Sequence, residues 1–276
     1  MSLPHSIINA SRIVSYHFNS TTIFSFKVAE NSSIFLPTDT VALIYSRSRI
    51  VGTRGLRSMI DTGYREKVLC ALNLMKGSAD VGLDESGRVA PLATIGSRLR
   101  LRPIKKPMSS LDVELIAAWR NEHRESFFTW FTATAEGTSK WLGEVISSRD
   151  RILFMTEVDQ TAFGHIGLRN FDYAGKSCEV DNVLRGRSGV MPGGMTYALR
   201  GLLVWLRSLQ MNSTELRVFS DNAAALNLYC KCGFLCVKEM PLVRVDDGGS
   251  VSWVELLGGS EGRDVRYATL MRADLD

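Results

Sequence analysis

From residue 98 onward, apolar residues recur with two distinct periods. The segment 99–104 alternates apolar and basic side chains, which is typical of a strand with one buried face. In 195–209 the apolar residues fall on one side of a helix instead. The same criteria predict strands at 99–104, 152–155, 163–168, 179–184, 216–219, 234–240, 251–257 and 265–271, and helices at 111–119, 138–148, 195–209 and 223–232. This order predicts an α/β domain with helices around a mixed central sheet.

The first 96 residues carry a weaker pattern. Short β-branched and aromatic runs predict a small meander or hairpins, and apolar spacing predicts one helix. The expected strands are 13–18, 22–28, 33–37 and 41–45, and the expected helix is about 56–75. A turn-rich passage precedes a boundary near Gly96–Arg98. We therefore predict two domains, a small α+β N-terminal domain of unknown role at 1–96 and the α/β domain at 97–276.

Composition narrows the class of protein. The chain has 276 residues, of which 45% are hydrophobic and 22% charged, with a formal net charge of +4. These values are ordinary for a soluble globular protein. No block is strongly basic, so we expect no nucleic-acid partner, although a site for one anionic small molecule needs only a few donors. No apolar stretch is long enough to predict a membrane span, and the first residues lack the pattern of a signal peptide.

The five cysteines are an odd number, which favours a reducing, cytoplasmic location. Cys230, Cys232 and Cys236 lie close together, but no Cys or His pair at zinc spacing accompanies them. We therefore expect apolar thiols packed in a core, and no bound metal.

A glycine-rich loop, 185–194, links a predicted strand to a predicted helix. Backbone N–H groups at a helix N-terminus are unpaired and attract anions, and glycine lets a phosphate approach them closely. The candidates for a pyrophosphate cradle are Gly193, Gly194 and Met195, with charge added by Arg185 and Arg187. The loop matches neither the Walker pattern nor G-x-G-x-x-G, so a plain strand-to-helix turn is the alternative.

The segment 220–234 contains a second candidate motif. Asn222 can cap a short helix that Gly233 ends, so a capped helix with a buried tyrosine is one interpretation. The residues Asn222, Ala225, Leu228, Tyr229, Gly233 and Phe234 also resemble the motif N-x-x-A-x-x-L-Y-x-x-x-G-F of the GNAT superfamily of acyl-CoA N-acyltransferases. The resemblance covers about residues 97–273 and includes the preceding loop and helix.

Three further segments narrow this resemblance. Trp119-Arg120-Asn121, Trp141-Leu142 and 179–186 look like the branch that contains amino-sugar and ribosomal-protein N-terminal acetyltransferases. The family resemblance implies a GNAT-like sheet in which two neighbouring parallel strands part. It also implies acetyl-CoA as co-substrate, with its pantetheine arm along the strand at Val183–Leu184. The residues implied at the coenzyme are Val183, Leu184, Arg185, Met191, Gly193, Gly194, Met195, Asn222 and Asn227.

The chemistry of amine acylation adds catalytic candidates. An amine attacks only when neutral, so a base must take its proton, and the leaving thiolate needs a proton in return. Glu179 and Asp181 are candidate bases on one sheet face, although either could instead pair with an arginine. His165 is a weaker candidate. Tyr229 matches the position of the family's frequent general acid, and simple packing is its alternative.

Arg120 and Asn121 end the first helix of this domain and are candidates for contacts with the acceptor. The aromatic run 127–131 follows, and it suits either stacking on a ligand or anchoring a buried loop.

We therefore expect an acetyl-CoA-dependent N-acetyltransferase that acts on a primary amine of a small molecule, most simply an amino sugar or a nucleotide-linked amino sugar. The alternatives are a protein N-terminal or side-chain acetyltransferase, or a non-catalytic GNAT-like module that binds CoA. The expected partner is the small-molecule amine, without nucleic acid or membrane, and a homodimer stays open.

Overall fold

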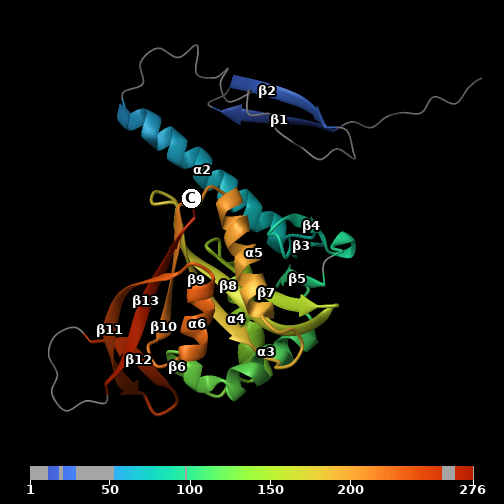
Figure 1. The fold of residues 1–276 in the computed structure, drawn as a ribbon. Helices are drawn as coiled ribbons and strands as arrows, with labels where there is room; N and C mark the ends of the chain where they lie inside the picture. Colours follow the sequence, from blue (N-terminus) through green and yellow to red (C-terminus); the bar gives the residue numbers. More distant parts are fainter. Residues whose placement is uncertain (1–11, 19–20, 29–52, 97, 257–264, 276) are drawn as a thin grey trace, which may run out of the picture. The chain divides into compact units, whose positions relative to one another are not determined.

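The computed structural model describes residues 12–18, 21–28, 53–96, 98–256 and 265–275 (Figure 1). By its contacts the chain divides into two compact units, Met1–Gly55 and Leu56–Asp276. In the first unit, β1 (Arg12–Phe18) pairs antiparallel with β2 (Thr21–Val28), which confirms the hairpin predicted there. The strands predicted at 33–37 and 41–45 lie outside the described residues.

The second unit is built on an 11-stranded sheet with the strand order β4-β3-β5-β7-β8-β9-β10-β13-β11-β12-β6. Its strands are β3 (Val81–Asp84), β4 (Val89–Pro91), β5 (Leu99–Pro103), β6 (Thr129–Trp130), β7 (Arg151–Val158), β8 (Thr161–Asp172), β9 (Ser177–Arg185), β10 (Ser213–Phe219), β11 (Leu235–Asp246), β12 (Val251–Glu255) and β13 (Val265–Asp274). The α-helices are α2 (Thr53–Lys76), α3 (Ser110–Glu122), α4 (Ala135–Ser147), α5 (Gly194–Ser208) and α6 (Ala223–Lys231), with short 3-10 turns at Leu92–Thr94 and Arg124–Ser126.

The sheet is mixed, as predicted. β9 and β10 run parallel, whereas the other described strand pairs of this sheet are antiparallel. The predicted strands and helices from residue 98 onward are all present, with β8 and β11 longer than their apolar runs. Among the described helices, none is long and apolar enough to cross a membrane.

The boundary between the two units differs from the predicted one. β3 pairs with β5, so that Leu83 lies opposite Leu101, and Val68 and Leu72 of α2 are buried in the same core cluster as the sheet. The division by contacts therefore falls before Leu56, and not near Gly96–Arg98. β3 is only four residues long and follows a turn-rich passage, so its alternation is too short to reveal that it extends the main sheet.

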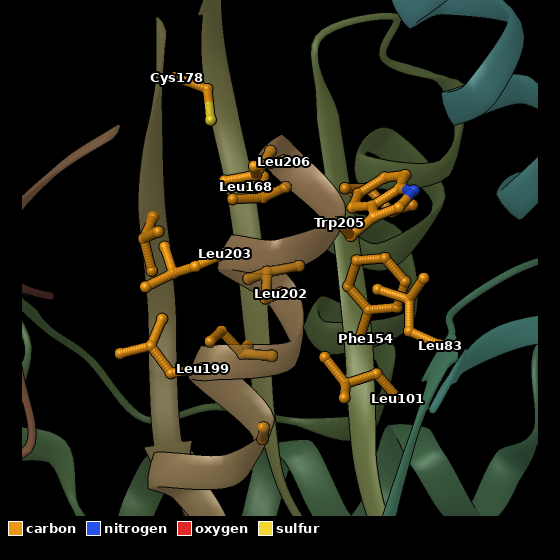
Figure 2. Packing of buried hydrophobic residues seen from close by; sticks show 14 of the residues in the cluster. Leu83, Leu101, Phe154, Leu168, Cys178, Leu199, Leu202, Leu203, Trp205 and Leu206 are labelled. Atoms are coloured by element: carbon orange, nitrogen blue, oxygen red, sulfur yellow. The ribbon is translucent and has the colours of Figure 1, made fainter. Parts of the chain in front are cut away.

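Helices cover both faces of the sheet, and alternate residues of β7 pack under different helices. Ile152 and Phe154 belong to the core cluster beneath α5, whereas Leu153 and Met155 belong to the cluster beneath α3 and α4. Figure 2 shows the first of these clusters, in which the leucines of α5 and Trp205 pack over the strands and Trp205 meets the edge of Phe154. The period of two in β7 thus separates two cores and fixes the sheet between two helical layers.

The predicted cap at Asn222 is confirmed, since its side chain accepts from the N–H of Ala225 at the start of α6. Ser109 likewise caps α3 by accepting from the N–H of Asp112. Gly233 follows α6 with φ of 89°, a left-handed conformation that suits glycine at a helix end.

The prediction for the cysteine cluster is wrong in part. Cys230 and Cys236 are exposed and Cys232 is half-buried, because the end of α6 and the start of β11 lie at the surface. Cys178, in contrast, is buried in the core.

Replacing Trp205 with alanine is expected to lower the free energy of unfolding by about 3–5 kcal/mol, because the lost side chain leaves a cavity against Phe154. The neighbouring Val204→Ala removes a side chain that is 43% exposed and should change the same free energy by less than about 0.5 kcal/mol. Urea unfolding followed by circular dichroism measures both. Equal effects would contradict the packing of α5 through Trp205.

Candidate active site between two parting strands

A cavity of about 560 Å³ lies where β9 and β10 part. Its wall comes from α3, the 126–134 loop, α4, β7, β8, β9, β10 and α6. Glu179, Asp181 and Tyr229, the catalytic candidates from the sequence, all line it, as do Arg120 and Asn222. The fold thus brings to one space side chains that are far apart in the chain.

The parting of β9 and β10 begins early. Their register runs from Ser177 opposite Ser213 to Glu179 opposite Glu215 and then ends. Beyond that point β10 keeps its partner β13 and β9 keeps β8, so each strand is held on its outer side. β9 also bulges at Asn182, which has φ of 49° where the register with β8 shifts. The separation of two parallel strands implied by the sequence resemblance is therefore present.

The carboxylate of Glu179 contacts two arginines and one asparagine. Its carboxylate accepts hydrogen bonds from Arg169 Nη2 at 2.7 Å and Asn170 Nδ2 at 2.8 Å, and Arg217 Nη2 lies 3.3 Å away. Burial alone would raise the pKa of Glu179, but these bonds and the charges of the two arginines outweigh it and lower that pKa. A carboxylate of lowered pKa is a weak proton acceptor, so the structure favours the ion pair for Glu179.

Asp181 faces the same cavity with looser partners. Arg151 Nη2 and Arg169 Nε lie 3.4 Å and 3.6 Å from Asp181 Oδ2, while Asn182 Nδ2 donates to it at 2.7 Å. Burial raises the pKa of Asp181, and the charges of the two arginines offset only part of that effect. The two carboxylates, two residues apart, therefore have pKa values displaced in opposite directions, and Asp181 is the better proton acceptor.

Gly167 on β8 makes room for this carboxylate. It lies opposite Asp181 in the register of β8 and β9, and a Cβ at Gly167 would lie 2.4 Å from Asp181 Oδ1. Any larger residue at this position would displace the carboxylate. The sequence does not single out Gly167, since the need for glycine arises only from its partner on the next strand.

Tyr229 lies on α6 with 6% of its surface exposed, and its ring centroid is 5.9 Å from that of Phe234. Burial raises the pKa of Tyr229, so its hydroxyl keeps the proton at neutral pH. Asn222, the cap of the same helix, also lines the cavity. The helix thus places a protonated donor in the cavity wall.

His165 lines the cavity too, and its Nδ1 donates to the carbonyl oxygen of Asn182 at 2.6 Å. Burial lowers the pKa of His165 to about 4; the charge of Arg120 adds to this effect and the hydrogen bond opposes it. The ring is therefore neutral near pH 7. Its bond ties β8 to the bulge of β9 and contributes no charge to the cavity.

Arg120 reaches the cavity from the last turn of α3. Its Nη2 donates to the carbonyl of Thr129 at 2.8 Å, and its guanidinium carbon lies 3.6 Å from the ring centroid of Phe127 and 5.0 Å from that of Phe131. Burial lowers the pKa of Arg120 to about 10, which still leaves the group charged at neutral pH. The loop thus holds a cation in a set position.

Asn121, the second acceptor candidate, is not among the described residues that line the cavity. Its Nδ2 donates to the carbonyl of Ala133 at 2.9 Å, and its Oδ1 accepts from the N–H of Ala133 at 2.7 Å. Both polar groups of the amide therefore hold the loop against the end of α3, where Arg120 also lies.

The aromatic run 127–131 divides by position. Phe128 packs on Phe219 with ring centroids 4.6 Å apart, and Trp130 packs on Trp253 at 5.7 Å. These rings form a cluster with β11, β12 and β13, so the buried-anchor interpretation is confirmed for the even positions. Phe127, Phe128 and Phe131 line the cavity, so Phe128 contacts both this cluster and the cavity.

The residues assigned to the coenzyme by resemblance fall in several places. Val183 and Asn222 line the cavity. Leu184 is buried in the core beneath α3 and α4, and Met195 in the core beneath α5. Asn227 lies exposed on α6. The residues of this set are therefore spread over the cavity wall, two cores and the surface, and only Val183 and Asn222 among them line the cavity.

The loop before α5 shapes the start of that helix. Gly193 is the N-cap with φ of 73°, and the N–H of Gly194 donates to the carbonyl of Met191 at 3.0 Å. Arg185 Nε donates to the carbonyl of Arg187 at 3.2 Å, which closes the loop on itself. The N–H of Thr196 donates to the carbonyl of Gly193 at 2.9 Å, so two of the first three amides of α5 already have acceptors. What this N-terminus offers a phosphate group is therefore the amide of Met195 and the positive end of the helix dipole.

The arginines that surround the two carboxylates are residues of the site that the sequence does not predict. Arg151, Arg169 and Arg217 come from β7, β8 and β10 and converge on β9 only through sheet pairing. Their side chains carry no sequence signal that separates them from ordinary surface arginines.

Comparison with known families gives one match. The model described as "Acetyltransferase (GNAT) domain" matches residues 98–235, which is half of the chain. The matched range contains the carboxylates of β9, the loop before α5 and all of α6. No curated protein matches the chain by sequence.

Three solved structures illustrate what the chain is similar to. A protein from Chromobacterium violaceum, described as a probable acetyltransferase of the GNAT family, is 17% identical with a TM-score of 0.50, covering 72% of this chain and 88% of that one. Spermidine N-acetyltransferase from Vibrio cholerae, with CoA and spermine, is 18% identical with a TM-score of 0.49, covering 64% and 96%. An N-acetyltransferase from Staphylococcus aureus is 15% identical with a TM-score of 0.49, covering 65% and 100%. At 17% identity, the likeness to the Chromobacterium protein shows the fold.

Proposed function

This chain belongs to the GNAT acetyltransferase family, and we propose that it transfers the acetyl group of acetyl-CoA to a primary amine of an amino sugar, free or nucleotide-linked. The parting of β9 and β10 at the cavity carries this proposal. A long, thin donor can lie along the inner edge of β9, near Val183, with its pyrophosphate at the N-terminus of α5. A thioester delivered along that edge would arrive beside Asp181 and Tyr229.

The reaction needs a group that accepts a proton from the amine and a group that donates a proton to the sulfur, and residues of both kinds line the cavity. Asp181, with its raised pKa, accepts the proton that the amine loses as its nitrogen bonds to the acetyl carbon. Tyr229, protonated at neutral pH, donates a proton to the sulfur as the carbon–sulfur bond breaks. Proton exchange with solvent then restores both side chains. Glu179 positions Arg169 and Arg217 around the site.

The wall of the cavity supports a sugar-like acceptor. Phe127, Phe131 and Trp141 contribute aromatic rings, of which Phe127 has one face covered by Arg120, and Thr129 and Asn182 belong to the same lining. Aromatic faces pack against the C–H surfaces of a ring, and hydroxyl and amide groups serve as partners for its hydroxyls. This mixture of lining groups supports a hydroxyl-rich amine more than a purely apolar one.

We expect the purified chain to consume acetyl-CoA with amino sugars such as glucosamine or a nucleotide-linked amino sugar, and not with a peptide that carries a free N-terminus. Release of free thiol, measured spectroscopically for each amine and for a sample without amine, tests this. Transfer to the peptide alone would show that the acceptor is a protein and not an amino sugar. Saturable CoA binding with no transfer to any amine would show that the chain is a CoA-binding module without this activity.

The variant Asp181→Asn is expected to lower kcat/KM at pH 7 by about 10²-fold or more, because the base is lost while the shape is kept. In the native chain, kcat/KM should rise as the pH rises through the raised pKa of Asp181, since only the carboxylate accepts a proton. The variant should lose that part of the pH profile. The titration of the amine is common to both, and Glu179→Gln is the matched comparison. Identical profiles for the native chain and Asp181→Asn would remove Asp181 as the base.

The variant Tyr229→Phe is expected to lower kcat by about 10²-fold or more, because it removes the proton donor to the sulfur. The Kd for CoA should change by less than about twofold, since the ring packing on Phe234 is kept. Tyr267→Phe, at a side chain that is 51% exposed on β13, serves as the control. Steady-state kinetics and calorimetry measure the two quantities. Unchanged turnover in Tyr229→Phe would eliminate the general-acid role.

A further inference from the structure

One cation in the cavity has no anionic partner. Arg151, Arg169 and Arg217 each pair with Glu179 or Asp181, as the cavity's ion pairs show. Among the described residues, Arg120 takes part in no ion pair, and its buried Nε has no hydrogen-bond partner. Its contacts are the carbonyl of Thr129 and two aromatic rings. Arg120 is half-buried, and a partly desolvated guanidinium without a counter-charge is unfavourable, so an anion at this position would be favoured.

The cavity as a whole also carries an excess of positive charge. Its lining contains four arginines against two carboxylates, and His165 is neutral near pH 7 because burial lowers its pKa to about 4. The pantetheine arm of the donor is uncharged, and its pyrophosphate is expected outside the cavity at the start of α5. The donor would therefore leave this positive charge unneutralised.

We propose that Arg120 binds an anionic oxygen group, a phosphate or a carboxylate, of the acceptor, so that the enzyme selects amines that also carry a negative charge. The inference rests on the proposed function in taking this cavity as the acceptor site. A planar guanidinium can form two parallel bonds to such a group, and the contacts of Arg120 with Phe127, Phe131 and the Thr129 carbonyl hold it in the cavity wall. A polycationic amine would instead meet unfavourable charge here.

The proposal is tested by calorimetric binding to the full chain saturated with CoA, which occupies the loop before α5. The probes are glucosamine, glucosamine 6-phosphate and glucosaminate, which share an amine and differ in the anionic group. Both anionic probes, or one of them, should bind at least about tenfold more tightly than glucosamine, and the stronger of the two identifies phosphate or carboxylate. Arg120→Gln should reduce this preference to less than about threefold. Arg124→Gln, an exposed neighbour outside the cavity lining, should keep it.

A measurement on the native chain guards against misfolding of the variant. Raising the salt concentration should weaken binding of glucosamine 6-phosphate and leave that of glucosamine nearly unchanged. Equal binding of all three probes, no binding of any, or a preference that survives in folded Arg120→Gln would overturn the proposal. Acetyl transfer in the same samples separates the two ideas. Equal transfer to neutral and anionic amino sugars overturns the role of Arg120 alone, whereas a preference for anions without any transfer overturns the proposed function alone.

Discussion

The rest of the site depends on the early end of pairing between β9 and β10. Three register pairs join the strands, and beyond Glu179 the backbone of β9 turns its inner edge to a cavity. The sheet stays continuous on either side of this break because β9 remains paired with β8 and β10 remains paired with β13. The break thus opens a ligand site within an otherwise continuous sheet, and every candidate catalytic group is arranged around it.

Electrostatics then gives neighbouring groups different chemistry. Glu179 and Asp181 share a strand, a face and a cavity, yet the arginines bond closely to the first and only approach the second. Their pKa values consequently move in opposite directions. Gly167 contributes by leaving the space in which the Asp181 carboxylate lies. Position along β9 alone does not distinguish the two residues, since the difference comes from the strands on either side.

The parts of the fold that the sequence predicts are those with a long local period or a cap. The helix α5, the strands of the mixed sheet and the cap at Asn222 all follow from such signals. The boundary near Gly96 did not match the contacts, because the short strand β3 joins the sheet through a partner that follows it in the chain. The site shows the same division. A motif predicts Tyr229, and the chemistry of amine acylation with a shared strand face predicts the carboxylates, whereas their arginine partners and the bulge at Asn182 exist only in three dimensions.

The packing of the loop 127–131 has a consequence for redesign of the acceptor site. Phe128 and Trp130 pack on the rings of β10 and β12, whereas Phe127 and Phe131 contact the guanidinium of Arg120. Because Phe128 also lines the cavity, one side chain shapes the ligand surface and the packing of the sheet together. A substitution at Phe127 or Phe131 changes the cavity wall and the support of the cation at once, so the ligand surface and its framework are coupled within five consecutive residues.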